Sequence, residues 1–178
     1  MKANEGRKIR VDLTNPDTEL FVEVRQKKAY NFLEKFSGPG GLPMGTQGRV
    51  VALLDGEASA AAAWMIMKRG CRVIAVTGEP GNREIGKPGD DGAQKALAML
   101  LPWVPGLTLH EIGDNSAEGL TKYARRKKAE AIILGSTYAE LEKGIPKAAI
   151  PILFPLCGMG DADIASLITR IRDARDPA

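Results

Sequence analysis

The segment Asp55 to Ser59, which reads Asp-Gly-Glu-Ala-Ser, has residue types and a position that could do chemistry. It follows the apolar run Val50 to Leu54, typical of a strand buried on both faces of a parallel sheet, and it opens an apolar helix over Ala58 to Arg69. Backbone N–H groups at such a strand-to-helix turn can hold a phosphate. Here Asp55 and Glu57 supply carboxylates instead, and these satisfy the positive end of the helix. We therefore expect a phosphate-type site in which bound anions are repelled.

The elements that must position this loop alternate between strand and helix. Beyond Val50 to Leu54, apolar runs predict strands at 73–76, 107–112, 131–134 and 152–154, with helices at 93–101, after Asn115 or Ser116, and from Asp161. This alternation predicts an α/β fold, a doubly wound five-stranded parallel sheet of order 3-2-1-4-5. Ligands of such sheets bind beyond the carboxyl ends of the strands, where the strand order reverses. The crevice is then walled by residues 55–59 and 135–137.

The first part of the chain follows a different pattern. Ile9, Val11 and Leu13 alternate with charged residues, and after an Asn15-Pro16-Asp17 turn the alternation resumes over Leu20 to Val24. This predicts a β-hairpin, which is marginally stable alone and must pack against the main domain, a partner or a second copy of itself. The Gly/Pro-rich segment Ser37 to Gly48 marks a boundary. We expect a hairpin unit over 1–36, a linker over 37–48 and an α/β domain over 49–178.

Composition narrows the class of protein only in part. The length of 178 residues suits one α/β domain plus an appendage, and 44% hydrophobic residues can fill one core. A net charge of +3 permits contact with RNA without requiring it. The two cysteines form no disulfide or metal pattern, and no secretory or membrane segment is present, so we expect a cytoplasmic protein without membrane contact.

Four stretches of the sequence resemble one known family. GPGGLPMGTQGRVVALLDGEASAAAAWMIMKRGC, AEAIILGSTYAELE and PILFPLCGMGDADIASLITRI resemble the catalytic domain of ThiI-type tRNA sulfurtransferases, the tRNA 4-thiouridine synthetases also linked to thiamine biosynthesis. VDLTNPDTELFVEV resembles the last part of their THUMP RNA-binding domain. The resemblance implies a PP-loop domain of the adenine nucleotide alpha hydrolase type, with ATP and Mg²⁺ as cofactors and tRNA as substrate.

The family's PP-loop reads Ser-Gly-Gly-x-Asp-Ser and holds ATP while a tRNA uridine is adenylated before sulfur transfer. The present loop is one residue shorter, and only Gly56 and Ser59 match it, with Ala58 in place of the aspartate and Glu140 in place of a later glutamine. The family's sulfur-carrying cysteines belong to a region outside this match. By resemblance, the candidate nucleotide-binding residues are Gly56, Ser59, Val76, Thr77, Gly135 and Ser136. The catalytic residues stay undefined.

Other candidate sites are weaker. Gly81 to Pro88 nearly matches a Walker phosphate loop, but Pro88 lacks the hydroxyl for magnesium, which favours a surface loop. The cations Lys122, Arg125, Arg126, Lys127 and Lys128 lie late in a helix, where they face solvent or contact RNA. Cys157 is expected to be a small buried hydrophobic residue, with a reactive thiol as the alternative. The single histidine, His110, lies on a strand with no partners for a catalytic triad, and no metal cluster is expected.

Two functions remain open from the sequence. The first is a ThiI-like PP-loop protein related to ATP-dependent tRNA 4-thiouridine synthesis, with its adenylating activity weakened or lost. The second is a non-catalytic scaffold or partner subunit that needs no cofactor. In the second case the hairpin docks onto a separate RNA-binding subunit or onto a second copy of the chain.

Overall fold

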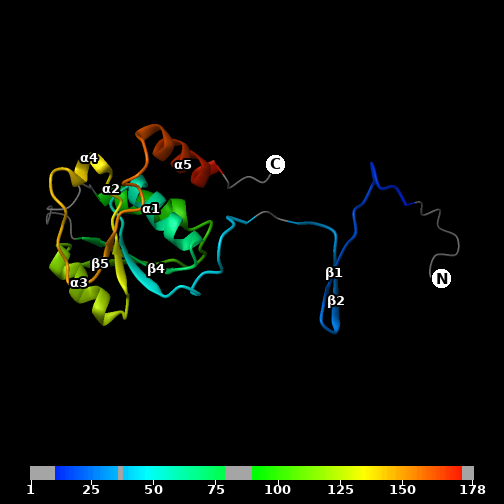
Figure 1. Ribbon diagram of the computed structural model, residues 1–178, viewed down its shortest axis with the longest axis horizontal. Coiled ribbons are helices and arrows are strands. Elements are labelled where there is room, and N and C mark those ends of the chain that lie inside the picture. The colour runs from blue at the N-terminus through cyan, green and yellow to red at the C-terminus, as the bar shows by residue number, and fades with distance from the viewer. Residues whose placement is uncertain (1–10, 36–37, 79–89, 174–178) are drawn as a thin grey trace. The chain divides into compact units, whose positions relative to one another are not determined.

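The protein was analysed as a computed structural model that describes residues 11–35, 38–78 and 90–173. The chain divides after Gly38 into two compact units, each with its own arrangement of elements (Figure 1). None of the helices in the described ranges has both the length and the apolarity that crossing a membrane requires.

The first unit contains a two-stranded antiparallel hairpin of β1 (Phe21–Arg25) and β2 (Lys28–Phe32). Phe21 pairs with Phe32 across the strands, and their rings stack with centroids 5.4 Å apart. At the other end Arg25 pairs with Lys28, so the turn has two residues, and Gln26 adopts a left-handed φ of 53°. A left-handed residue in a tight turn matches the twist of the two strands.

The hairpin was predicted correctly as an element, but its placement was wrong. The sequence put the first strand over 9–13 and the turn at Asn15-Pro16-Asp17, whereas residues 11–20 form no strand. Residue 9 lies outside the described residues. The carboxylate of Asp12 accepts the backbone N–H groups of Thr14 and Asn15, each at 3.0 Å. Such local side-chain bonds compete with a strand ladder, which explains the shift toward the C-terminus.

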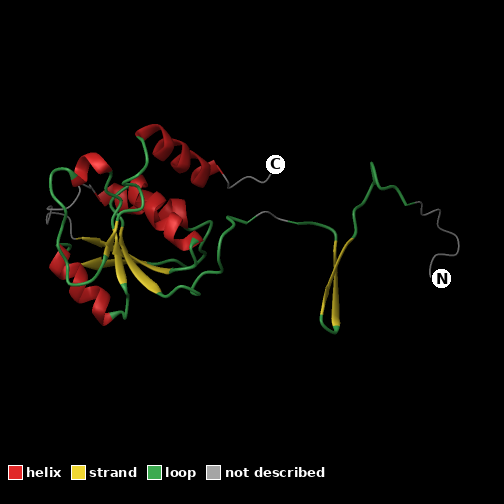
Figure 2. Cartoon of the chain, viewed as in Figure 1, coloured by secondary structure: helices red, strands yellow, loops and turns green. Residues whose placement is uncertain are grey.

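The second unit is built on a five-stranded parallel sheet (Figure 2). Its strands are β3 (Arg49–Leu53), β4 (Arg72–Gly78), β5 (Leu109–Ile112), β6 (Ala131–Ile133) and β7 (Ile152–Leu153). They lie in the order β5-β4-β3-β6-β7, which is the predicted order 3-2-1-4-5. The fold class is confirmed.

Helices cover both faces of this sheet. They are α1 (Glu57–Lys68), α2 (Asp90–Leu100), α3 (Ala117–Arg126), the single-turn α4 (Tyr138–Leu141) and α5 (Asp161–Asp173). Helices α1, α2 and α5 contact one another and pack on the face that holds Val50, Ala52 and Leu54. Helix α3 packs on the opposite face with Val51 and Leu53. Alternate residues of β3 therefore enter two separate cores, as a doubly covered strand requires.

The glycine-rich segment before β3 is docked against the end of α1. The N–H of Leu42 donates to the Lys68 carbonyl oxygen at 2.8 Å, and the N–H of Gly45 donates to the Gly70 carbonyl oxygen at 2.7 Å. Gly41 has a φ of +93°, and a Cβ on it would lie 2.1 Å from the Lys68 oxygen. This close backbone approach explains why glycine stands there.

Candidate functional site

The loop from β3 into α1 lies at the carboxyl edge of the sheet. The N–H of Leu54 still donates to the Val76 carbonyl oxygen of β4 at 2.8 Å, and the chain then turns at Asp55. Gly56 is the N-cap of α1, with an extended backbone (φ 169°, ψ −173°). Only two residues thus separate the last sheet bond from the first residue of the helix, Glu57.

Ser59 closes this loop on itself. Its side-chain oxygen accepts the backbone N–H of Asp55 at 2.9 Å and that of Gly56 at 3.1 Å. Its hydroxyl proton is donated to the Gly56 carbonyl oxygen at 2.7 Å. Ser59 is buried, with 1% of its surface exposed, so these bonds are sheltered from water. Two amides at this turn, those of Asp55 and Gly56, are therefore already paired with a side chain of the protein.

The second wall of the predicted crevice touches the first. A Cβ on Gly135, which follows β6, would lie 2.5 Å from Cα and 2.6 Å from the backbone N of Ser59. Ser136 comes next and is half-buried. Thr137 caps the short helix α4, and the Glu140 carboxylate accepts the Thr137 N–H at 2.8 Å. The structure therefore brings Gly56, Ser59 and Gly135 together.

Carboxylates dominate the charge around this loop. Burial raises the pKa of the Asp55 carboxyl, hydrogen bonding with Ser59 opposes the rise, and the nearby Glu140 carboxylate adds to it. The Glu57 carboxylate accepts a hydrogen bond from the guanidinium of Arg172 on α5. Sequence reasoning missed Arg172, because no local pattern links α5 to the first turn of α1.

The other two candidate nucleotide-binding residues lie on the neighbouring strand. Val76 is fully buried within β4 and pairs in register with Leu53. Thr77 is half-buried, and its hydroxyl lies 3.5 Å from the Gly78 carbonyl oxygen. The Asn115 side chain lies over Gly78, where a Cβ would be 2.3 Å from its Nδ2. These residues share the carboxyl edge with Ser59, but within the described part of the chain none of them hydrogen-bonds to its hydroxyl.

The basic cluster lies at the opposite edge of the sheet from this loop, because α3 runs antiparallel to the strands and ends near their amino ends. Lys122 pairs with Glu118 at 2.8 Å. The cations of Arg126 and Lys127 lie 4.9 and 5.6 Å from the centroid of the Tyr123 ring. The structure thus separates the candidate RNA-binding residues from the candidate nucleotide-binding residues.

The remaining candidates take no part in this site. Cys157 is exposed, so the prediction of a buried residue was wrong, since the chain has already left β7 at that point. Cys71 is half-buried and near the Gln47 carbonyl oxygen, at 3.4 Å. No group of metal-ligating side chains was found within the described ranges. The near-Walker segment 81–88 lies outside the described residues.

Comparison with known proteins relates both sequence and fold to one family. The family described as "Thiamine biosynthesis protein (ThiI)" matches residues 45–100. The Methanosarcina acetivorans protein named "Probable tRNA sulfurtransferase" is 34% identical over 94% of this chain and 48% of its own length. A protein of the same name from Methanobrevibacter smithii is 57% identical over 37% of this chain and 18% of its own length. The chain spans about half the length of the curated relatives that it matches over most of its residues.

Solved structures agree with this relation. A protein from Pyrococcus horikoshii superposes with a TM-score of 0.65 and 29% identity, over 90% of this chain and 53% of the other. The structure described as a 4-thiouridine synthetase–RNA complex with bound ATP has a TM-score of 0.57 and 25% identity, over 94% of this chain and 52% of the other. The parallel sheet and its strand–loop–helix edge define a PP-loop α/β protein. Within that class, the sequence and fold of the chain are similar to those of ThiI-type PP-loop proteins.

Proposed function

We propose that this protein acts on tRNA as a ThiI-like PP-loop protein whose own adenylating site is weakened or lost. The relation to tRNA is supported by the relatives named as tRNA sulfurtransferases and by the similar 4-thiouridine synthetase solved with RNA and bound ATP. The loss of adenylation is supported by one observation in this chain: the side chain of Ser59 hydrogen-bonds to the backbone of Asp55 and Gly56 within the same loop.

A phosphate loop works because several backbone N–H groups converge on the anion at the start of a helix. In this chain the amides of Asp55 and Gly56 donate to Ser59 Oγ instead. A phosphate can gain these donors only by displacing the hydroxyl of Ser59, a buried residue whose backbone lies against Gly135. The site would have to break existing bonds before it makes new ones.

Charge acts in the same direction. A phosphate charge about 5 Å from a carboxylate is disfavoured by roughly 3 kcal/mol at an effective dielectric near 20, or about a hundredfold in affinity. Asp55 stands at the loop with Glu140 nearby, and no cation is paired with Asp55 in the described residues. Glu57 is partly compensated by Arg172, so most of the repulsion falls on Asp55.

Calorimetry with ATP and Mg²⁺ tests this proposal directly. The intact chain is expected to give no binding heat up to about millimolar ATP, because each unfavourable charge pair weakens binding by roughly a hundredfold. The double variant Asp55→Gly/Glu57→Gly removes both carboxylates and frees Arg172, so its affinity for ATP should rise. The matched control Asp161→Gly/Asp163→Gly removes two acids from the first turn of α5 and should leave ATP binding unchanged.

Micromolar ATP binding by the intact chain contradicts the loss of the site. If neither the intact chain nor the Asp55→Gly/Glu57→Gly variant binds ATP, charge repulsion is not what prevents binding. In that case, the hydrogen bonds of Ser59 alone account for the closed loop.

A second candidate function, a non-catalytic partner subunit, is favoured by the hairpin. One face of its two strands exposes Val22 and Val24, with 59% and 71% of their surfaces accessible, and Leu20 and Leu33 extend this apolar face. Such a face suits docking onto a separate RNA-binding subunit or a second copy of the chain. Sedimentation equilibrium of the intact chain and of Val22→Ser/Val24→Ser tests self-association. A monomer in both cases excludes the second copy and leaves the separate subunit.

A further inference from the structure

The amino edge of the sheet gathers basic side chains that come from distant parts of the sequence. Arg49 begins β3 and Arg72 begins β4, and the two are register partners in adjacent parallel strands. Two residues further along these strands come Val51 and Ile74, and both pack on the α3 face of the sheet. Because side chains alternate along a strand, Arg49 and Arg72 belong to that same face.

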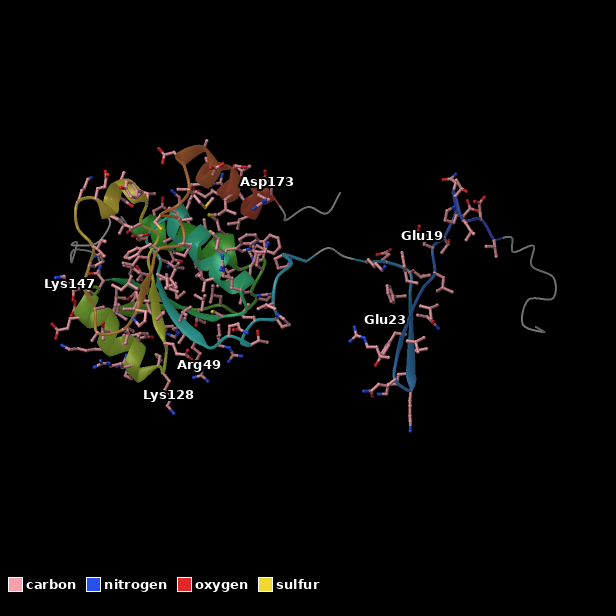
Figure 3. The ribbon with its side chains drawn as sticks, viewed as in Figure 1. Glu19, Glu23, Arg49, Lys128, Lys147 and Asp173 are labelled. Carbon is pink, nitrogen blue, oxygen red and sulfur yellow. The ribbon has the colours of Figure 1, made fainter. Side chains whose placement is uncertain are left out.

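The end of α3 brings further cations to this place. After its last residue, Arg126, the chain turns through Lys128, which has a left-handed φ of 56°. The N–H of Glu130 then donates to the Arg49 carbonyl oxygen at 2.9 Å, which ties the turn to the start of β3. Figure 3 shows Arg49 and Lys128 at the same end of the α/β unit. We define the amino-edge surface by these residues: Arg49, Arg72, Arg125, Arg126, Lys127 and Lys128.

The charges on the amino-edge surface are left largely uncompensated. None of its six basic side chains takes part in an ion pair within the described residues. The nearby acid, Glu130, has its carboxylate beside Gly48, where a Cβ would lie 2.6 Å from Oε1. Lys122, one turn earlier on α3, is different because it pairs with Glu118. The sequence grouped Lys122 with this cluster, whereas the structure favours Arg49 and Arg72.

We propose that the amino-edge surface binds the sugar–phosphate backbone of an RNA duplex, away from the crevice at the other edge of the sheet. Basic side chains without a neighbouring exposed aromatic ring contact phosphates rather than bases, so this binding is independent of sequence and strongly dependent on salt. The proposal rests on the proposed relation to tRNA. It adds where the chain holds the RNA.

The position of this surface has a geometric consequence. A strand of five residues such as β3 spans about 17 Å at 3.3 to 3.4 Å per residue. RNA on the amino-edge surface is therefore separated from the carboxyl edge by roughly the length of a strand. The surface anchors a part of the RNA remote from any nucleotide at the carboxyl edge.

Binding of the intact chain to a tRNA and to a short RNA duplex, measured over a series of salt concentrations, tests the proposal. The variant Arg49→Gln/Arg72→Gln removes the two cations contributed by the strands, and Arg125→Gln/Lys128→Gln removes two from the end of α3. Each pair is expected to weaken binding to both RNAs by about tenfold or more and to lower the salt slope by roughly 1 to 2. The matched control Lys143→Gln/Arg170→Gln removes two exposed cations from α5 and the segment after α4, and should change neither value.

The outcomes separate this surface from the wider relation to tRNA. If the intact chain binds RNA and both amino-edge variants bind like the control, the amino-edge surface is refuted while the relation to tRNA stands. If the intact chain binds no RNA at all, the proposed function fails together with the surface. Tighter binding to vesicles containing an anionic lipid than to either RNA overturns the assignment of RNA as the partner. Equal thermal unfolding of all variants excludes misfolding as a cause.

Discussion

Replacement of Ser59 by alanine tests the central feature of the loop. The change removes the acceptor of the Asp55 and Gly56 N–H groups and the donor to the Gly56 carbonyl oxygen. Loss of an N-terminal capping hydroxyl costs about 0.5 to 2 kcal/mol, and a buried donor left without a partner costs about 1 to 3 kcal/mol. Asp55 and Gly56 are half-buried, so water can reach part of the site. We expect a loss of about 2 kcal/mol in the free energy of unfolding.

Urea denaturation followed by circular dichroism measures this loss, and Ser166→Ala on the exposed side of α5 is the matched control. The control should lie within about 0.5 kcal/mol of the parent. Hydrogen exchange gives a second readout, since the amides of Asp55 and Gly56 should exchange faster in Ser59→Ala while those of β3 keep their protection. A loss no larger than that of Ser166→Ala, with unchanged exchange at both amides, refutes the closed loop.

Other substitutions probe the close contacts of the α/β unit. Gly135→Ala, with its Cβ 2.5 Å from backbone, should lose about 1 to 3 kcal/mol in urea unfolding, whereas Gly158→Ala, with open space, should not. Gly41→Ala should lose more than Gly40→Ala, because both have positive φ but only the first meets a carbonyl oxygen; equal losses contradict the clash. Burial raises the pKa of the Asp55 carboxyl in the folded state, so the folded protein holds this proton more tightly than the unfolded chain does. The free energy of unfolding therefore falls as pH rises through the folded pKa. Asp55→Asn should therefore stabilise the protein at pH 7 and lose this advantage below about pH 4; no gain at pH 7 contradicts it.

The sheet could be predicted from the sequence because its signals are local and mutually consistent. The uninterrupted apolar run of β3 predicts a doubly covered strand, and both of its faces are indeed buried. The end of α1 was also predictable, since Gly70 has the left-handed φ of 87° that favours glycine after a helix. The order of the five strands then followed from the alternation of strands and helices.

Features that depend on side-chain geometry could not be predicted in the same way. The hairpin has alternating residues over two overlapping windows, and only the Asp12 side-chain bonds and the Gln26 turn decide between them. The loop residues 55–59 were expected to carry opposing carboxylates, but the sequence gives no sign that Ser59 would bond the loop's amides. The pairing of Glu57 with Arg172 joins residues 115 positions apart, which is a tertiary contact.

The hydrogen bonds of Ser59 also constrain how this protein can change. A variant that gives up the serine loses stability at once, whereas a usable anion pocket additionally needs a longer turn and fewer acids. A sequence that has lost the serine but does not yet bind an anion is therefore less stable than the present one. Under the proposed loss of the adenylating site, a design that aims at nucleotide binding should therefore begin with a residue inserted into the turn, before any single substitution.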